Sequence, residues 1–160
     1  MSKIAVVYWS GTGNTEMMAE KVVEGAKAAG AEVTLFTATE FSVDKVGEYD
    51  AIAFGCPSMG EEELEDTEFE PMFTSCESAL KDKKIALFGS YGWGDGEWMR
   101  TWEDTCKNDG AVLACESVIC NEEPDDETND ACVALGKALA ELTKTTIYNY
   151  IHTYIQENAL

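Results

Sequence analysis

Residues 4–15, IAVVYWSGTGNT, run from an unbroken apolar segment into a loop of glycines and hydroxyl-bearing residues. The loop leads into a segment whose apolar residues share one helical face, and Gly30 supplies a helix stop. A strand, a tight loop and a helix form the unit from which parallel sheets are built. The opening of the chain therefore predicts an α/β protein with a candidate binding loop after its first strand.

The rest of the chain repeats this alternation of strand-like and helical patterns. Strand character appears at 4–8, 33–36, 51–55, 84–88 and 111–119, and helical patterns appear near 18–26, 43–48, 71–80, 97–109 and 127–142. The first and third strands are apolar throughout, as expected when helices cover both faces of a parallel sheet. Ligands of such sheets bind beyond the carboxyl ends of the strands, which here means loops 9–16, 55–63 and 89–96.

Composition limits the classes of partner. The 160 residues are 45% hydrophobic, enough apolar material for the core of one domain. Thirty-one acidic residues against eleven basic ones give a formal net charge of -20, which repels nucleic acid and anionic membranes. A basic protein surface is the partner that such a chain attracts.

The cysteines and the single histidine indicate no metal site. Six cysteines occur without a C-x2-C pair, and His152 is the only histidine, so we expect reduced, mostly buried thiols. The first twenty residues contain no apolar core of a signal peptide, and no apolar run has the length of a membrane span. We expect a cytoplasmic protein.

The loop after the first strand has the features of a phosphate-binding turn that lacks a cation. It fits neither the G-K-[ST] ending of a Walker loop nor a G-x-G-x-x-G fingerprint, because Glu16 stands where the third glycine would be. The first helical turn offers unpaired amides, and Gly11 and Gly13 allow a close approach to an anion. Neutral donors are added by Ser10, Thr12, Asn14 and Thr15. The alternative is an ordinary N-capping turn.

Two further loops carry residues suited to a planar ligand. Residues 89–96, GSYGWGDG, space four glycines around two aromatic side chains, which favours stacking of a ring on Trp93 over a role for Trp93 in the core. Residues 55–62, GCPSMGEE, follow the third strand and would supply the opposite wall through Met59. Plain packing of Met59 is the alternative.

Taken together, these motifs resemble those of the flavodoxins, in particular the short-chain type of clostridia. The matching segments are YWSGTGNTE at 8–16, GCPSMG at 55–60, EFEP at 68–71, ALFGSYGWGDGEWM at 86–99 and NEEPDD at 121–126. The resemblance implies a flavodoxin-like doubly wound five-stranded parallel sheet in the order 2-1-3-4-5 with helices on both faces. It also implies noncovalent FMN, with its phosphate in loop 10–15 and its ring between Met59 and Trp93.

The family pattern, carried over position by position, assigns roles to the remaining loop residues. Glu62 would accept the N3–H of the ring, the backbone near Gly92 and Gly94 would face its pyrimidine edge, and the Gly60-Glu61 peptide would flip on reduction. Pro57 and Ser58 replace serine and alanine of some relatives. The FMN-binding residues expected in the second and third loops are Pro57, Ser58, Met59, Gly60, Glu61, Glu62, Ser90, Tyr91, Gly92, Trp93 and Gly94.

The function implied is that of a low-potential one-electron carrier that shuttles between the semiquinone and hydroquinone forms of FMN. Acids near the flavin, including Glu62 and Glu123, would oppose addition of the second electron, because that electron adds negative charge. We expect an electron-transfer protein rather than an enzyme, with redox partners that present basic docking faces. The alternative is an FMN-dependent NAD(P)H:quinone or flavin reductase on the same fold.

Residues 143–160 extend past the expected end of the last helix. We therefore divide the chain into an FMN-binding domain at 1–142 and a C-terminal extension at 143–160. A helical stripe of apolar residues predicts a helix, although the β-favouring residues also suit a strand. The extension would dock on its own domain or form an interface with a second copy or a partner. The stripe comprises Ile147, Tyr148, Ile151, Tyr154 and Ile155.

Overall fold

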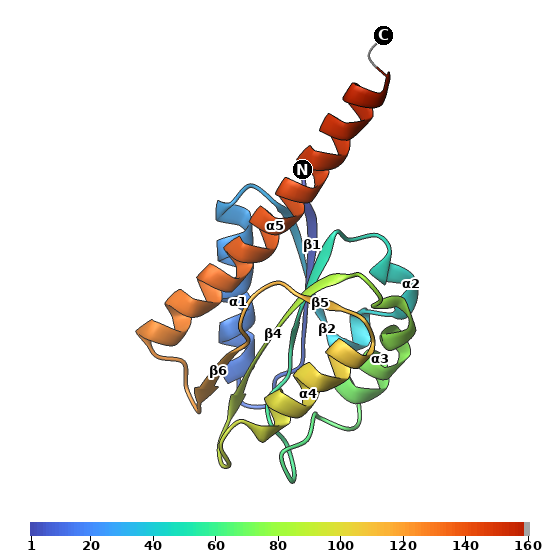
Figure 1. Cartoon of the computed structure of the whole chain (residues 1–160). Coiled ribbons are helices and arrows are strands. Elements are labelled where there is room, and N and C mark those ends of the chain that lie inside the picture. The colour runs from blue at the N-terminus through green and yellow to red at the C-terminus, as the bar shows by residue number, and fades with distance from the viewer. Residues whose placement is uncertain (159–160) are drawn as a thin grey trace.

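The structure is a computed structural model that describes residues 1–158, without the side chains of 145–150. A central sheet lies between two layers of helices, and one long helix projects from the body (Figure 1). The strands are β1 (Lys3–Tyr8), β2 (Glu32–Thr37), β3 (Ala51–Gly55), β4 (Lys84–Tyr91), β5 (Val112–Leu113) and β6 (Val118–Asn121). The helices are α1 (Asn14–Ala28), α2 (Val43–Val46), α3 (Phe69–Cys76), α4 (Glu97–Asn108) and α5 (Asp126–Asn158), with short 3-10 turns η1 (Ala38–Glu40) and η2 (Glu77–Ala79).

The sheet has the predicted topology. Its strand order is β2-β1-β3-β4-β5, and the paired strands run parallel. β1 lies in register between its two neighbours, with Val6 opposite Leu35 of β2 and opposite Ala53 of β3. The strand order reverses at β1 and β3, so the loops that follow these strands diverge and leave a crevice between them.

Alternate residues of the strands pack into two separate hydrophobic cores, one on each face of the sheet. Ala5 and Val7 of β1 pack into the core beneath α3 and α4, whereas Ile4 and Val6 pack into the core beneath α1 and α5. This alternation is the two-residue period of a strand. Both faces of β1 and β3 are buried, which explains why these strands are apolar without interruption.

The prediction of one continuous fifth strand over 111–119 is wrong. The segment forms two short strands, β5 and β6, and both pair with β4, β5 near its start and β6 near its end. Ala114 still donates its N–H to Ile85, and the chain then leaves the sheet over residues 115–117, which carry the charged Glu116. Beyond that interruption β6 resumes at the edge of the sheet and ends at Asn121 beside Tyr91.

α1 and α5 pack side by side at close range on one face of the sheet (Figure 1). Glycine permits this approach on both helices. A Cβ on Gly25 of α1 would lie 1.9 Å from the carbonyl oxygen of Val133, and a Cβ on Gly136 of α5 would lie 2.1 Å from that of Val22. The first part of α5 is therefore fixed firmly against the body of the domain.

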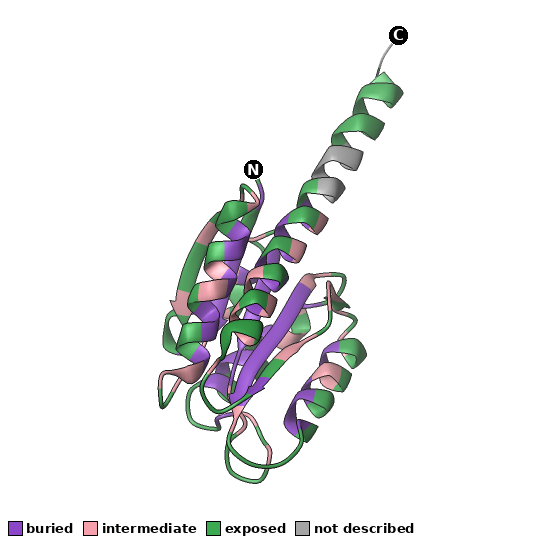
Figure 2. Ribbon diagram, turned by 90° about the vertical axis from the view of Figure 1, so that its left-hand side faces the viewer, coloured by how far each residue is buried: buried purple, intermediate pink, exposed green. Residues whose placement is uncertain are grey.

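α5 does not end at residue 142. It continues without a break to Asn158, and its side chains from Ile151 onward are exposed (Figure 2). The expectation of an extra helix docked on its own domain is therefore wrong for this part of the extension. The side chains of Ile147 and Tyr148 lie outside the described residues, and the division of the chain at 142/143 stays a prediction.

Five of the six cysteines are buried, Cys115 is half-buried, and all six are free thiols, in agreement with the expectation from the sequence. No helix within residues 1–158 combines the length and the apolar character that crossing a membrane requires.

Candidate functional site

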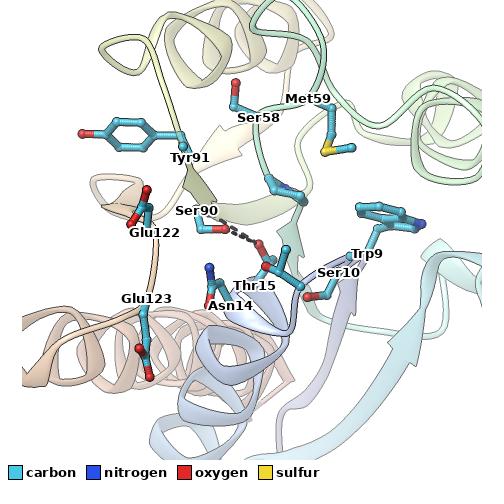
Figure 3. Close-up of a pocket in the computed structure, with 14 residues that line it drawn as sticks. Trp9, Ser10, Asn14, Thr15, Ser58, Met59, Ser90, Tyr91, Glu122 and Glu123 are labelled. Carbon is cyan, nitrogen blue, oxygen red and sulfur yellow. Dashed lines mark hydrogen bonds between the residues drawn. The ribbon is translucent and has the colours of Figure 1, made fainter.

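A cavity of about 530 Å³ opens at the carboxyl ends of β1, β3, β4 and β6. Its volume lies in the usual range of small-molecule sites, roughly 300–1,000 Å³. Trp9 and Met59 lie along one side of it and Tyr91, Glu122 and Glu123 along the other (Figure 3). The lining residues are Trp9, Ser10, Gly11, Thr12, Asn14, Thr15, Pro57, Ser58, Met59, Ser90, Tyr91, Gly92, Glu122 and Glu123.

The loop before α1 presents backbone amides to this cavity. The hydroxyl oxygen of Ser10 accepts the N–H of Gly13 at 3.1 Å and that of Glu16 at 3.2 Å. Ser10 thus satisfies part of the helix terminus, although the N-cap position itself is Gly13 and has no side-chain cap, so the loop is not an ordinary N-capping turn. Within the described chain, the N–H groups of Thr12, Asn14 and Thr15 form no hydrogen bond to another protein group. These three amides remain available to an anion at the positive end of the helix dipole.

A pair of hydroxyls ties the start of α1 to the end of β4. Thr15 is buried, and its Oγ1 lies 3.1 Å from Oγ of Ser90. The carbonyl of Ser90 also accepts the N–H of Ser58 at 2.9 Å, which connects the second loop to the same point. The start of α1, the end of β4 and the loop after β3 are therefore joined at the floor of the cavity, where Figure 3 shows the contact between Thr15 and Ser90.

The second loop closes as a tight turn beyond the cavity. Met59 and Glu63 exchange two backbone hydrogen bonds, of 2.7 and 2.8 Å, across residues 60–62. Gly60 has φ of 54° and Glu62 has φ of 56°, a conformation that costs free energy in a residue other than glycine. The hydrogen bond of the Glu62 side chain stabilises this unfavourable backbone conformation.

Glu62 fastens the second loop to the third. Its Oε1 accepts the N–H of Asp95 at 3.1 Å, and a Cβ on Gly94 would lie 1.8 Å from that same oxygen. Gly94 has φ of +85° and is needed both for this conformation and for the close approach. Arg100 of α4 in turn bonds to the carboxylate of Asp95 at 2.8 Å, and this hydrogen bond lowers the pKa of Asp95.

Four aromatic or polarisable side chains lie around the site, and they differ in how far they are exposed. Tyr91 rests on buried Trp98, with ring centroids 5.5 Å apart. Trp9 is half-buried, whereas Met59 is 40% exposed and Trp93 is 62% exposed. An exposed tryptophan on a loop with several glycines contributes little to the core, which supports a role at the surface of the site.

The charge of the site is entirely negative. Among the residues that the structure describes, no lysine or arginine lines the cavity, and its two ionisable carboxylates belong to Glu122 and Glu123. An anion at the floor of the cavity would thus meet neutral hydrogen-bond donors, while the edge formed by Glu122 and Glu123 repels additional negative charge. No cluster of metal-ligating side chains occurs in the described part of the chain.

The structure brings most of the predicted site residues to one cavity. Eleven of them line it, from Ser10 and its loop to Gly92. The others do not line it, namely Gly13, Gly60, Glu61, Glu62, Trp93 and Gly94, and Glu62 instead lines a separate cavity beside Trp98 and Trp102. Sequence reasoning did not select Trp9 or Glu122 as binding residues. Trp9 directly follows an apolar strand and Glu122 precedes Glu123, so position at a strand end was the signal that could have identified them.

Comparison with known proteins agrees with this geometry. The protein family described as Flavodoxin matches residues 6–136. A flavodoxin of Megasphaera elsdenii is 47% identical over 138 residues, covering 86% of this chain and 98% of the relative. A flavodoxin of Clostridium beijerinckii is 42% identical over 137 residues, covering 86% of this chain and 99% of the relative.

Solved structures show the same fold. The solution structure of two-electron reduced Megasphaera elsdenii flavodoxin superimposes with a TM-score of 0.80 at 48% identity, covering 86% of this chain and 98% of that one. A flavodoxin from the domain Archaea gives a TM-score of 0.79 at 26% identity, covering 89% of this chain and 99% of that one. These proteins are matched almost to their full length, whereas the family match on this chain stops at residue 136.

Proposed function

The chain belongs to the flavodoxin family and is an FMN-binding electron carrier, and from this premise we propose that it works as a low-potential one-electron shuttle. The observation that carries the proposal is the charge arrangement of the cavity, with neutral donors at its floor and carboxylates at its edge. The comparisons do not favour the alternative of a reductase. We propose that the protein catalyses no reaction of its own.

The residues of the cavity fit FMN. A phosphate needs several donors converging on one point, and the free amides of Thr12, Asn14 and Thr15 provide them at the start of α1. The hydroxyls of Ser10 and Thr12 stand beside these amides. No cation is required, because the helix terminus supplies the positive potential. Ser58 and Ser90 would hold the polar chain between the phosphate and the ring.

The side walls suit a flat aromatic ring. Trp9 and Met59 offer an aromatic face and a polarisable sulfur, and Tyr91 is held in place by Trp98. Trp93 is exposed beside the lining residue Gly92, and we propose that it covers the ring when FMN is bound. FMN supplies a ring that takes up and releases single electrons. The protein excludes water from that ring and sets its surrounding charge.

The Gly60-Glu61 peptide is the proposed adjustable hydrogen-bonding group of the site. It lies in the turn closed by Met59 and Glu63, and Gly60 already has a positive φ. Glycine lets the peptide rotate at low steric cost. We propose that its carbonyl, once rotated, would accept a hydrogen bond from an N–H group of the bound ring. Glu62, bonded to the N–H of Asp95, would keep the ends of this turn fixed during the rotation.

We propose that the acidic edge of the cavity lowers the reduction potential of bound FMN. Glu122 and Glu123 line the cavity, and each repels the negative charge that the second electron adds. One such charge at about 10 Å in water-like screening contributes roughly 0.4 kcal/mol, or about 20 mV for one electron. Several acids together therefore make the reduced carrier a stronger reductant.

The acidic residues around the cavity also favour redox partners with a basic surface. We propose that redox proteins with basic faces dock at the acidic end of the domain, where long-range attraction speeds encounter. The free thiols suit a reducing compartment, and we propose the cytoplasm. A redox titration of the FMN-loaded protein tests the proposal. Two separated one-electron steps support it, and a single two-electron step contradicts it.

A further inference from the structure

The projecting end of α5 carries apolar side chains without a partner in the described structure. Ile151 is 50% exposed, Tyr154 is 59% exposed and Ile155 is 56% exposed. All three belong to α5, whose C-terminal end is exposed and extends past the body (Figure 2). Large apolar side chains gathered on one helical face are the usual mark of a contact surface.

These side chains continue the side of α5 that is buried in the domain. Ile151 lies eleven residues after buried Ala140, and Tyr154 lies eleven residues after buried Thr143. Eleven residues are about three turns, so each pair shares one side of the helix. Ile155, four residues after Ile151, is the neighbour of Ile151 one turn further on. The helix thus keeps a core-facing pattern after its own core has ended.

The charge of the extension distinguishes it from the rest of the chain. Residues 143–160 contain one basic residue, Lys144, and one acidic residue, Glu157, so the formal charge of -20 resides on residues 1–142. A basic partner is attracted to that acidic body rather than to the extension. A helix with no net charge and an apolar stripe is instead a surface on which two copies of so acidic a protein can meet with little repulsion.

We propose that two copies of the chain form a dimer through antiparallel pairing of their α5 extensions. A twofold interface uses the same patch on both copies, which a single apolar stripe satisfies. Antiparallel pairing brings the Lys144 end of one extension toward the Glu157 end of the other, whereas parallel pairing places like charges together. It also keeps the two acidic bodies at opposite ends of the pair.

The base of the extension is shaped to receive the partner helix. A notch of about 150 Å³ lies where α5 leaves the body and is lined by Met1, Ala29, Gly30, Ala31, Ala140 and Lys144, with Ser2. Met1 is 86% exposed beside it. Residues 143–158 span about 24 Å as a helix, long enough for the end of one extension to approach the notch of the other.

The dimer leaves both FMN sites accessible. Thr143 lies with Asp50 and Lys84, which precede or begin β3 and β4, so α5 leaves the body at the amino ends of the strands. The FMN cavity is at the carboxyl ends of the same strands, on the opposite side of the domain. The proposed contact therefore joins two carriers without covering the surface that exchanges electrons.

The test is the mass of the FMN-loaded full chain in solution as a function of concentration. We expect it to rise from the monomer value of 17.5 kDa toward twice that value, because the paired stripes are small and the dimer dissociates on dilution. Ile151→Glu combined with Ile155→Glu should raise the dimer dissociation constant at least about tenfold. Thr153→Glu with Gln156→Glu adds the same charge to the opposite side of the helix and should change it little.

The orientation has its own test. Lys144→Glu should weaken an antiparallel dimer, and adding Glu157→Lys should restore it. A parallel pair would respond to neither change, and this result would overturn the proposed arrangement. A protein that stays monomeric at all concentrations, or an apolar-face variant no weaker than its control, would overturn the dimer. FMN fluorescence quenching should remain unchanged in every variant, so failure of the dimer is separable from failure of FMN binding.

Discussion

Oγ1 of Thr15 lies 3.1 Å from Oγ of Ser90, and these two residues are seventy-five positions apart in the chain. Thr15 belongs to the first turn of α1, and Ser90 is near the end of β4. The contact fixes the helix terminus that we propose for the phosphate against the strand whose loop carries Tyr91 and Trp93. One pair of hydroxyls thus sets the distance between the two halves of the FMN site.

Replacing Thr15 by valine should loosen this connection. The buried hydroxyl of Ser90 loses its partner at a cost of about 1–2 kcal/mol, and we expect a loss of that size in the free energy of unfolding together with weaker FMN binding. Denaturant unfolding and FMN titration measure the two effects. Thr105→Val is the matched control, because the Thr105 hydroxyl donates to Thr101 within α4. Equal FMN affinity in both variants would argue against a positioning role for Thr15.

Neutralising the acidic edge should make the carrier a weaker reductant. We expect Glu122→Gln with Glu123→Gln to raise the potential of the second one-electron step by roughly 20 mV per residue. The first step should move less, since the flavin gains a full negative charge mainly in the second. Glu48→Gln, at an exposed position before β3, removes a charge far from the cavity and serves as the control. A shift of the same size per charge removed in the control would assign the effect to total charge.

Electron exchange with a basic protein should slow as salt is added. The attraction acts over about a Debye length, which shrinks from about 30 Å at 0.01 M to about 8 Å at 0.15 M ionic strength. We expect the second-order rate with a basic haem protein to fall about tenfold over that range. The double Glu122, Glu123 variant should show a shallower salt dependence. A rate independent of salt would exclude electrostatic docking at this end of the domain.

Glu65 should contribute to stability only when it is ionised. It is buried, and although burial itself raises the pKa of Glu65, hydrogen bonds from Thr67, Glu68 and Phe69 outweigh this and lower it. A lowered pKa in the folded state stabilises the protein above the unfolded pKa, about 4.3, and the benefit is lost as pH falls through the folded value. We expect Glu65→Gln to cost about 1.5–3 kcal/mol at pH 7. Near pH 3 the difference should shrink, while neighbouring Glu68→Gln should have little effect at either pH.

The sequence predicted the fold well because burial on both faces leaves a clear pattern. β1 and β3 are apolar throughout, and the helices between them have ordinary amphipathic periods, so their order and approximate ends could be predicted. The sequence pattern did not show that the fifth strand is split into β5 and β6. The interruption at residues 115–117 depends on how the segment pairs with β4, which is a tertiary contact. The extension was ambiguous for a similar reason, since its isoleucines and tyrosines suit helix and strand alike.

The candidate site was predictable where a loop follows a strand directly. Ser10, Ser58 and Ser90 reach the cavity because each lies close after or near the end of a buried strand. The place of Glu62 could not be anticipated in the same way. Its contact with the N–H of Asp95 depends on two turns with positive φ, at Glu62 and Gly94, that bring separate loops together. Tertiary contacts of this kind leave no periodic signal in the sequence.

The most direct measurement is a titration of the FMN-free protein with FMN and, separately, with riboflavin, followed by quenching of flavin fluorescence. We propose that backbone amides and hydroxyls at the start of α1 hold the phosphate without a lysine or an arginine. This arrangement predicts tight binding of FMN, binding of riboflavin weaker by at least about a hundredfold, and a greater loss of FMN affinity than of riboflavin affinity in Ser10→Ala. Equal affinity for the two flavins, or no quenching by FMN, would contradict the account.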